Sequence, residues 1–174
     1  MQANIEVFLC EEKIRHRVAE LAGEISKDYA GHEVTLLCTL GGAVFFLADL
    51  SRALEIPVQI EYIKASSYGD GTEPGQKVNL EYTPGEKLAG KHVLWVEDIV
   101  DTGSTVVSVK KHLTELGPKS LKLVSLLDKP DRRQHKNVEI HYLGFTIPDK
   151  FVVGYGLDYA GKYRNLPYIG VLQA

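Results

Sequence analysis

Hydrophobic residues recur every three or four positions in three stretches of the chain, which is the spacing of amphipathic helices. These stretches cover residues 11–29, 43–54 and 106–116, and Gly117-Pro118 ends the third. Each stretch presents one apolar face that can pack against another layer of structure. The pattern therefore predicts three helices.

Short apolar runs rich in β-branched residues alternate with these stretches and predict buried strands. The runs cover residues 34–40, 58–65, 93–98 and 121–127. Strands that alternate with helices form βαβ units, which build an open, mainly parallel sheet with right-handed crossovers. From residue 138 onward the pattern is less regular, with short apolar pieces among Gly, Pro and Tyr. We predict an α/β fold in which residues 1–174 form a single domain.

Residues 66–77, with the sequence SSYGDGTEPGQK, interrupt this alternation. They are polar and rich in glycine and follow neither hydrophobic period, which is typical of a loop. Long loops inside compact domains often have a function. The segment is therefore either a plain surface loop or a flexible lid over a binding site, and the pattern alone leaves both open.

The composition is that of an ordinary globular protein and disfavours several classes. The 174 residues carry a net charge of −3 at pH 7, which does not suit a general nucleic-acid binder. Cys10 and Cys38 lie far apart and form neither a zinc motif nor a disulfide framework. No apolar run approaches the roughly 20 residues that span a bilayer, and the N-terminus lacks a signal-peptide pattern. We expect a cytoplasmic protein that binds neither nucleic acid nor a membrane.

The stretch from Val96 to Thr105, VEDIVDTGST, contains the strongest candidate chemistry. A strand ends at two adjacent carboxylates, and a turn with three hydroxyl residues and one glycine leads into a helix. The amides at a helix N-terminus favour a phosphate group, and ligands of open parallel sheets bind at the carboxyl ends of the strands. We therefore predict a phosphorylated ligand at Thr102, Gly103, Ser104 and Thr105.

The three acids of this stretch need a separate explanation, because they would repel a phosphate. Glu97 and Asp98 could accept hydrogen bonds from sugar hydroxyls or hold Mg²⁺, and Asp101 could transfer a proton. The alternative is that these acids cap the helix and face solvent at the strand end. Their combination with a hydroxyl-rich turn after an apolar strand favours a binding site.

This stretch closely resembles the motif with which type I phosphoribosyltransferases bind 5-phosphoribosyl-1-pyrophosphate (PRPP). Other segments resemble the hypoxanthine-guanine phosphoribosyltransferases of that family. They are residues 64–68 (KASSY), 126–129 (LLDK), and 150–159 (KFVVGYGLDY) with Tyr163-Arg164. The resemblance covers nearly the whole chain. It implies the type I phosphoribosyltransferase fold, in which a small hood from the chain ends, mainly residues 138–174, covers the active site.

The resemblance also implies where PRPP and its metal ion bind. The ribose phosphate would contact Glu97, Asp98, Asp101, Thr102, Gly103, Ser104 and Thr105. Mg²⁺ would be held near Glu97, Asp98 and Asp158. Arg164 would contact pyrophosphate, a task that suits a forked guanidinium, and Asp101 would be the catalytic residue that manages the proton on N7 of the base.

By the same resemblance, a 6-oxopurine base would be bound by Lys129, Phe151, Val152 and Asp158. Lys129 would donate to O6 and Phe151 would stack on the ring, since a flat aromatic offers a large contact area. Ser67 and Tyr68 would belong to a flexible catalytic loop over about residues 66–78. On the residues alone, Phe151 is better explained as a core residue and Lys129 as an exposed lysine. The alternatives for Asp158 and Arg164 are a loop cap and an exposed surface arginine.

The turn after the first predicted core strand departs from the family pattern. Many members have a lysine after the leucine that ends this strand, in a loop that contacts pyrophosphate through an often cis peptide, whereas this chain has Leu40-Gly41-Gly42. Gly41 and Gly42 either form a simple turn or bind pyrophosphate through their amides, because glycine allows close approach to the backbone. We expect the Leu40–Gly41 bond to be cis in at least one ligand state.

The resemblance implies a purine-salvage enzyme that transfers the phosphoribosyl group of PRPP to hypoxanthine, and to guanine, and releases pyrophosphate. Two alternatives stay open, because the fold does not determine the function. They are a transferase that prefers xanthine or guanine and a nucleotide-binding regulator on the same fold. The family suggests a homodimer or homotetramer. Residues 131–136, a short charged run, are interpreted as a solvated turn.

Overall fold

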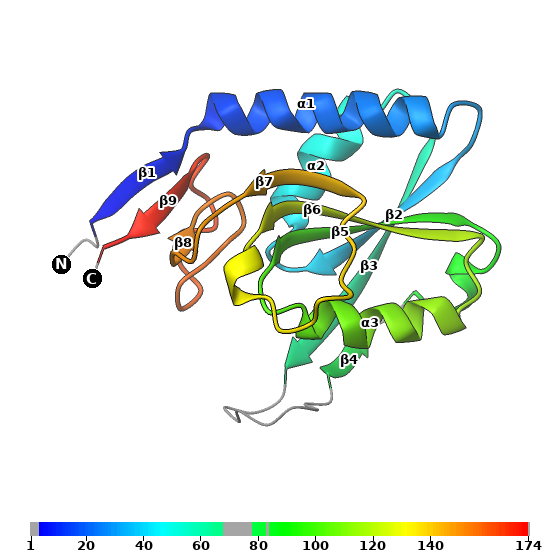
Figure 1. Cartoon of the computed structure of the whole chain (residues 1–174). Coiled ribbons are helices and arrows are strands. Elements are labelled where there is room, and N and C mark those ends of the chain that lie inside the picture. The colour runs from blue at the N-terminus through cyan, green and yellow to red at the C-terminus, as the bar shows by residue number, and fades with distance from the viewer. Residues whose placement is uncertain (1–3, 68–77, 83, 174) are drawn as a thin grey trace.

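A computed structural model of the chain describes residues 4–67, 78–82 and 84–173. Its centre is a six-stranded sheet in the order β4-β3-β2-β5-β6-β7 (Figure 1). The strands are β2 (Val34–Leu40), β3 (Val58–Ser67), β4 (Val78–Tyr82), β5 (His92–Val100), β6 (Ser120–Asp128) and β7 (Tyr142–Thr146). Neighbouring strands are parallel except β4, which is antiparallel to β3. The predicted parallel α/β architecture is confirmed.

Helices cover both faces of this sheet. The helices α1 (Glu11–Asp28) and α2 (Val44–Ala53) lie on one face and α3 (Ser104–Glu115) lies on the other (Figure 1). Leu21 and Phe46 are buried in the apolar layer under α1 and α2, and Val109 is buried in the layer under α3. The two hydrophobic layers hold the sheet in place and leave its strand ends accessible. The 3-10 helices η1 (Gly85–Leu88) and η2 (Pro130–Arg132) follow β4 and β6.

In the part of the chain that the structure describes, no helix is both long enough and apolar enough to cross a bilayer.

A second sheet, in the order β1-β9-β8, lies beyond the carboxyl ends of the central strands (Figure 1). It consists of β1 (Ile5–Leu9), β8 (Val152–Val153) and β9 (Ile169–Leu172). The predicted hood does come from both chain ends, since β1 from the start of the chain pairs with β9. Its main boundary, residues 138–174, needs a correction, because β7 pairs with β6 in the central sheet. A short apolar segment does not reveal by its sequence which of two sheets it joins.

The predicted strand at residues 58–65 continues to Ser67 and pairs with β4, which the hydrophobic pattern did not indicate. The predicted flexible loop at residues 66–78 is therefore too long at both ends, because Ser67 lies in β3 and Val78 lies in β4. Tyr68 and the rest of that segment, to residue 77, lie outside the described residues.

Candidate active site

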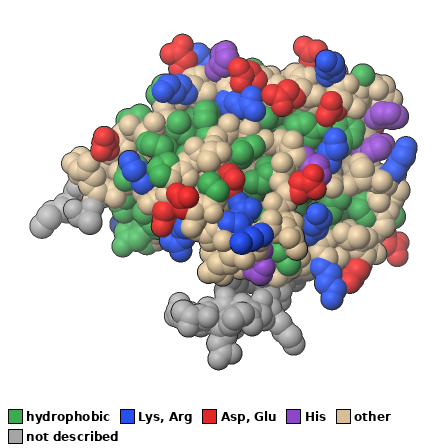
Figure 2. Space-filling model, viewed as in Figure 1, with side chains coloured by type: hydrophobic (Ala, Val, Ile, Leu, Met, Phe, Trp, Pro, Cys, Tyr) green, Lys and Arg blue, Asp and Glu red, His purple; other side chains and the backbone are tan. Residues whose placement is uncertain are grey.

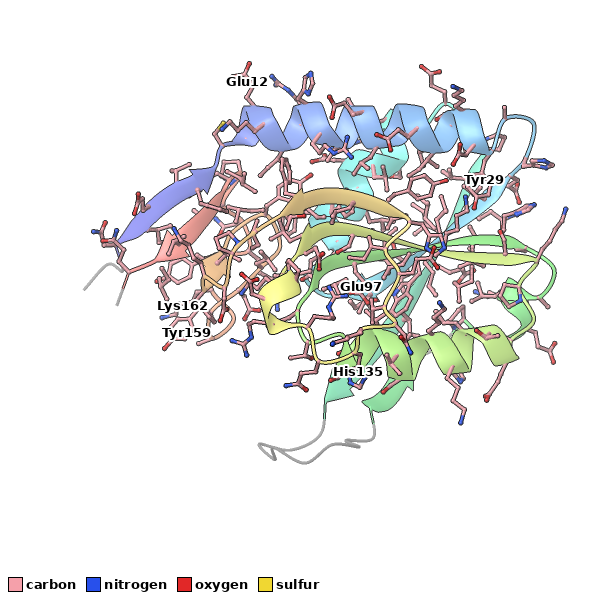
Figure 3. The ribbon with its side chains drawn as sticks, viewed as in Figure 1. Glu12, Tyr29, Glu97, His135, Tyr159 and Lys162 are labelled. Atoms are coloured by element: carbon pink, nitrogen blue, oxygen red, sulfur yellow. The ribbon has the colours of Figure 1, made fainter. Side chains whose placement is uncertain are left out.

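The strands β2, β5 and β6 bring the candidate residues to one edge of the central sheet. Thr39 and Leu40 end β2, Asp128 ends β6, and Glu97 and Asp98 lie near the end of β5. Because the three strands are parallel, these ends meet on the side that faces the second sheet (Figure 1). Figure 3 labels Glu97 at this level of the central sheet. This is where an open parallel sheet places its ligands.

Glu97 is a buried carboxylate with 5% of its surface exposed. Its Oε1 accepts a hydrogen bond of 2.7 Å from Thr39 Oγ1, which in turn accepts one of 2.8 Å from Trp95 Nε1. Burial and the adjacent Asp98 raise the pKa of Glu97 to about 8, although the bonds from Thr39 and Trp95 oppose this shift. The ionised form would be stabilised by a ligand that donates hydrogen bonds or carries positive charge.

Asp98, which is half-buried, is the second acid near this strand end. Burial raises its pKa, while the hydrogen bond of 2.8 Å from the Ile99 amide and the positive charge of Arg164 lower it. The backbone of Gly42 lies directly against it, since a Cβ on Gly42 would come within 1.5 Å of Asp98 Oδ2. Glycine at position 42 therefore lets the turn after β2 touch the carboxylate that ends β5.

The turn after β2 also contacts the hood segment that leads to β9. Gly156 packs against the carbonyl oxygen of Gly42 so closely that a Cβ there would lie 1.9 Å from it. Arg164 Nη1 donates a hydrogen bond of 2.5 Å to the Gly156 carbonyl, and Arg164 Nη2 lies 2.7 Å from Asp158 Oδ1. The structure thus brings Arg164 and Asp158 to the Gly41–Gly42 turn.

Three expectations about these residues have different outcomes. The Leu40–Gly41 peptide bond is cis, as expected. Asp158 Oδ2 accepts a hydrogen bond of 2.8 Å from the Gly161 amide, so the loop-capping interpretation of Asp158 is correct whatever else it binds. Arg164 is not a free surface arginine, because both of its terminal nitrogens have partners.

The turn from Thr102 to Thr105 is organised by its own hydroxyl groups. Thr102 Oγ1 accepts a hydrogen bond of 3.3 Å from the Ser104 amide and donates one of 3.1 Å to Ser104 Oγ. Gly103, with a φ of 86°, directly precedes α3, a helix of 12 residues. The first amides of this helix have no partner within the helix, so they can bind an anion in the predicted way.

Asp101 lies between this turn and a segment that the sequence interpretation placed in solvent. Arg132 Nε is 3.1 Å from Asp101 Oδ1, an ion pair without the geometry of a hydrogen bond. Arg133 Nε donates a hydrogen bond of 3.2 Å to the Asp101 carbonyl, and Arg133 also pairs with Asp128. Residues 131–136 do form a turn that is exposed except at Arg133, as interpreted, but the contacts of Arg132 and Arg133 show that it also packs over Asp101.

His135 belongs to the same segment and lies over the start of α3, where Figure 3 labels it. Its Nε2 is 3.2 Å from Ser104 Oγ. The backbone amide of Gln134 donates a hydrogen bond of 3.0 Å to the Thr102 carbonyl. The sequence interpretation missed these residues. The only signal in the sequence was the charge of this run, which does not show that it folds back over a turn about thirty residues earlier.

The residues predicted to bind a purine lie between β6 and the second sheet. Lys129 is 6% exposed, and its Nζ lies 3.9 Å from Asp149 Oδ1. Phe151 is 54% exposed, so the alternative that it is a core residue is wrong. Its ring contacts the Tyr159 ring edge to face, with centroids 5.6 Å apart. Val152 lies in β8, an edge strand of the small sheet, where one side of the backbone has no neighbouring strand.

The carboxylates near the Gly41–Gly42 turn could contribute to a metal site but do not complete one. Among the described residues, no three His, Cys, Asp or Glu side chains form a group that could hold a metal ion. Mg²⁺ is commonly bound by one or two carboxylates together with water and the phosphates of a substrate. Asp98 fits this pattern, because a nearby cation would offset the burial that raises its pKa.

Comparison with known proteins agrees with this arrangement. A family model described as the phosphoribosyl transferase domain matches residues 9–160. Hypoxanthine phosphoribosyltransferase of Salmonella typhimurium is 44% identical over 172 residues, which cover 98% of this chain and 96% of that protein. Hypoxanthine-guanine phosphoribosyltransferase of Mycobacterium tuberculosis is 45% identical over 172 residues, which cover 95% of this chain and 85% of that protein.

A solved structure is similarly close. The crystal structure of a hypoxanthine-guanine phosphoribosyltransferase from Bacillus anthracis, with a HEPES molecule in its active site, superposes with a TM-score of 0.93. The two chains are 42% identical, and the match covers 99% of this chain and 100% of the other.

The contact between Gly42 and Asp98 yields a stability prediction. Gly42→Ala should lower the free energy of unfolding by about 1–3 kcal/mol, because the added methyl group overlaps the carboxylate and forces a shift. Gly41→Ala is the matched control, since a Cβ at that position meets no described atom within 4 Å. Urea unfolding of both variants tests this, and equal losses would contradict the close approach at position 42.

The raised pKa of Glu97 predicts how stability depends on pH. Folded protein holds this proton more tightly than unfolded protein, so stability should fall as pH rises from about 4.5 towards 8, by at most about 1.4 kcal/mol per unit. Glu97→Gln cannot ionise and should gain stability over wild type between about pH 5.5 and 8.5. Urea unfolding in metal-free buffer measures this, with the exposed Glu139→Gln as the control. A difference between Glu97→Gln and wild type that does not change with pH would refute the buried, proton-retaining state.

Proposed function

The chain belongs to the phosphoribosyltransferase family, and we propose that it is a purine-salvage enzyme that transfers the 5-phosphoribosyl group of PRPP to hypoxanthine, and to guanine. The reaction forms a bond between the base and C1 of the ribose, giving IMP or GMP, and breaks the bond from C1 to pyrophosphate. Its substrates are therefore one strongly anionic sugar phosphate and one flat 6-oxopurine.

The buried ammonium group of Lys129 is the observation that carries the choice of base. A buried lysine has three N–H donors to satisfy, and the Asp149 carboxylate is 3.9 Å away. A carbonyl oxygen such as O6 of hypoxanthine or guanine would accept from it, whereas the amino group of adenine at that position would not. The exposed ring of Phe151 supplies a stacking surface, and the free backbone edge of Val152 supplies hydrogen bonds to the base edge.

In this proposal, each part of the PRPP molecule has its own set of binding residues. The 5-phosphate binds the amides and hydroxyls from Thr102 to Thr105 at the start of α3. The ribose hydroxyls bind Glu97 and Asp98, which are acceptors at the end of β5. Pyrophosphate binds the amides of the Gly41–Gly42 turn and Arg164.

A divalent ion, which we propose to be Mg²⁺, would neutralise charge on the leaving pyrophosphate. Asp98 and Asp158, with Glu97 behind them, are the residues that would hold it, mostly through water and the substrate's own oxygens. The protein itself orients the sugar and keeps water away from its reactive carbon. Water would otherwise capture the cation-like sugar, so the hood and the segment around residues 66–78 are proposed to exclude it.

Asp101 is proposed to accept or return the proton on N7 of the base. Its carboxylate lies between the phosphate turn and Arg132, an arrangement that fixes the position of Oδ1 without surrounding it with hydrogen-bond donors. A positioned carboxylate of this kind is suited to proton transfer.

One assay tests the proposed function. Pyrophosphate release from PRPP and Mg²⁺ is measured with hypoxanthine, guanine, xanthine, adenine and uracil as the acceptor. We expect hypoxanthine and guanine to be used and adenine and uracil to be rejected. Use of xanthine in preference to hypoxanthine would favour a xanthine-type transferase, and no release with any base would favour a nucleotide-binding regulator.

On the face drawn in Figure 2, acidic and basic side chains are interspersed rather than gathered by sign.

Lys129 should determine base binding. Lys129→Met keeps much of the side-chain volume but removes the charge, and losing a charge-assisted hydrogen bond costs about 1.5–3 kcal/mol. The KM for hypoxanthine should therefore rise about 10- to 100-fold, with a smaller change in the KM for PRPP. Lys150→Ala, which removes an exposed neighbouring lysine, serves as the control. Equal losses for both substrates would assign Lys129 a different role.

Asp101 should determine the rate rather than the affinity. Asp101→Asn is expected to lower kcat by a factor of about 10²–10⁴ while the dissociation constant of PRPP stays within a few fold, because backbone groups hold the phosphate. Single-turnover kinetics measure this under conditions in which the chemical step limits the rate. Asp131→Asn, at an exposed neighbouring acid, provides the comparison. If Asp101→Asn retains more than about half of the wild-type rate, Asp101 does not carry the proton.

A further inference from the structure

We propose that Thr39 is a positioning residue that, held by Trp95, aims the carboxylate of Glu97 at the ribose hydroxyls of PRPP. The proposal rests on the proposed function for the identity of the ligand. It is carried by the chain of two hydrogen bonds from Trp95 Nε1 to Thr39 Oγ1 and from Thr39 Oγ1 to Glu97 Oε1, of 2.8 Å and 2.7 Å.

The direction of this chain is fixed by the chemistry of its first member. The indole N–H of Trp95 can only donate, so Thr39 Oγ1 must accept from it. The single hydroxyl hydrogen of Thr39 is then available for Glu97 Oε1, which accepts it when Glu97 is ionised. Oε1 of Glu97 is thereby committed to the protein. The proposal assigns the other oxygen, Oε2, to the ribose hydroxyls.

Burial makes this orientation rigid. Trp95 is 1% exposed and Glu97 is 5% exposed, so water cannot readily replace either partner. All three residues lie on adjacent strands of the central sheet, where Cys38 of β2 pairs with Val96 of β5. A carboxylate that is held by the neighbouring strand β2 does not have to be ordered when the substrate binds, and that pre-organisation favours affinity.

The position of Thr39 also connects two parts of the site. Leu40, Gly41 and Gly42 follow Thr39 directly. The residue that holds the Glu97 carboxylate therefore leads into the turn that is proposed to bind pyrophosphate. The two halves of PRPP on either side of C1 would therefore be aligned by one short piece of backbone. A threonine supplies this link because it combines a β-branched shape suited to a strand with a hydroxyl group.

The chain offers a direct probe and a matched control. Trp95 is the only tryptophan among the 174 residues, so its indole N–H gives a single, self-assigned NMR signal. Thr35 lies on the same strand and is 1% exposed, and its hydroxyl makes no hydrogen bond to any residue that the structure describes. Thr39→Val and Thr35→Val thus exchange the same groups in the same strand, but only Thr39→Val breaks the series of hydrogen bonds from Trp95 to Glu97.

Three measurements on the full-length protein test the proposal. In Thr39→Val the indole proton signal should move upfield, and the KM for PRPP should rise about tenfold or more while kcat and the KM for hypoxanthine change less than about threefold. Thr39→Ser should restore both the signal and the KM, and Thr35→Val should alter neither. In a Glu97→Gln background, Thr39→Val should have a clearly smaller effect on PRPP than in wild type, because Thr39 acts through Glu97.

The proposal is overturned if Thr39→Val leaves the KM for PRPP within about twofold of wild type, or if its effect is undiminished when Glu97 is already changed. If Thr39→Val fails to fold, the proposal is tested with Thr39→Ser and wild type. Addition of PRPP with Mg²⁺ must then shift the Trp95 indole signal in both proteins. An unshifted signal refutes the link from Trp95 through Thr39 and Glu97 to PRPP. Failure of the proposed function is seen separately, as PRPP binding by calorimetry without transfer to any base.

Discussion

The placement of two adjacent acids, Glu97 and Asp98, at the buried end of a central strand is the constraint on which the rest of this site depends. Removing a carboxylate from water is unfavourable unless hydrogen bonds or charges compensate, and here burial raises the pKa of both groups. The surrounding structure supplies only part of the compensation. Glu97 receives the Thr39 hydroxyl and Asp98 receives the Ile99 amide. The missing compensation is further hydrogen-bond donors or positive charge, which a sugar with free hydroxyl groups or a cation would supply.

Several features of the sequence are consequences of that constraint. The turn after β2 can lie against Asp98 only because position 42 has no side chain, and the hood segment can lie against that turn only because position 156 has none. Arg164 then reaches this region from the hood and contributes positive charge to the surroundings of Asp98. The two sheets are thus joined at this site by backbone contacts and one guanidinium. This arrangement brings the residues proposed to bind pyrophosphate beside those proposed to bind the ribose.

Much of this could be predicted from the sequence, because the signals are local. The periodicity indicated three helices and four parallel strands, and the residues around Asp101 indicated a turn that leads from a strand into a helix. The strands β4 and β7 were harder, since the partner of a short edge strand is decided by tertiary contacts. The role of residues 131–136 was missed for a related reason. Charge alone does not distinguish a segment in solvent from one folded over another loop, and the contacts of Arg132 and His135 span about thirty residues of sequence.

The distribution of positive charge explains how this chain can lack a lysine at position 41. The space beside Gly41 is open, so a larger side chain is not excluded by packing at that point. Neither the Gly41–Gly42 turn nor the turn from Thr102 to Thr105 contains a cationic residue of its own. The charge comes instead from neighbouring segments, with Arg164 beside the first turn and Arg132 and Arg133 beside the second. A cation on a separate segment can be paired with a carboxylate while the site is empty, as Arg132 is with Asp101 and Arg164 is with Asp158. If an anionic substrate binds as proposed, these ion pairs would have to rearrange, so the same arginines would serve the carboxylates of the empty site and the phosphates of the bound one.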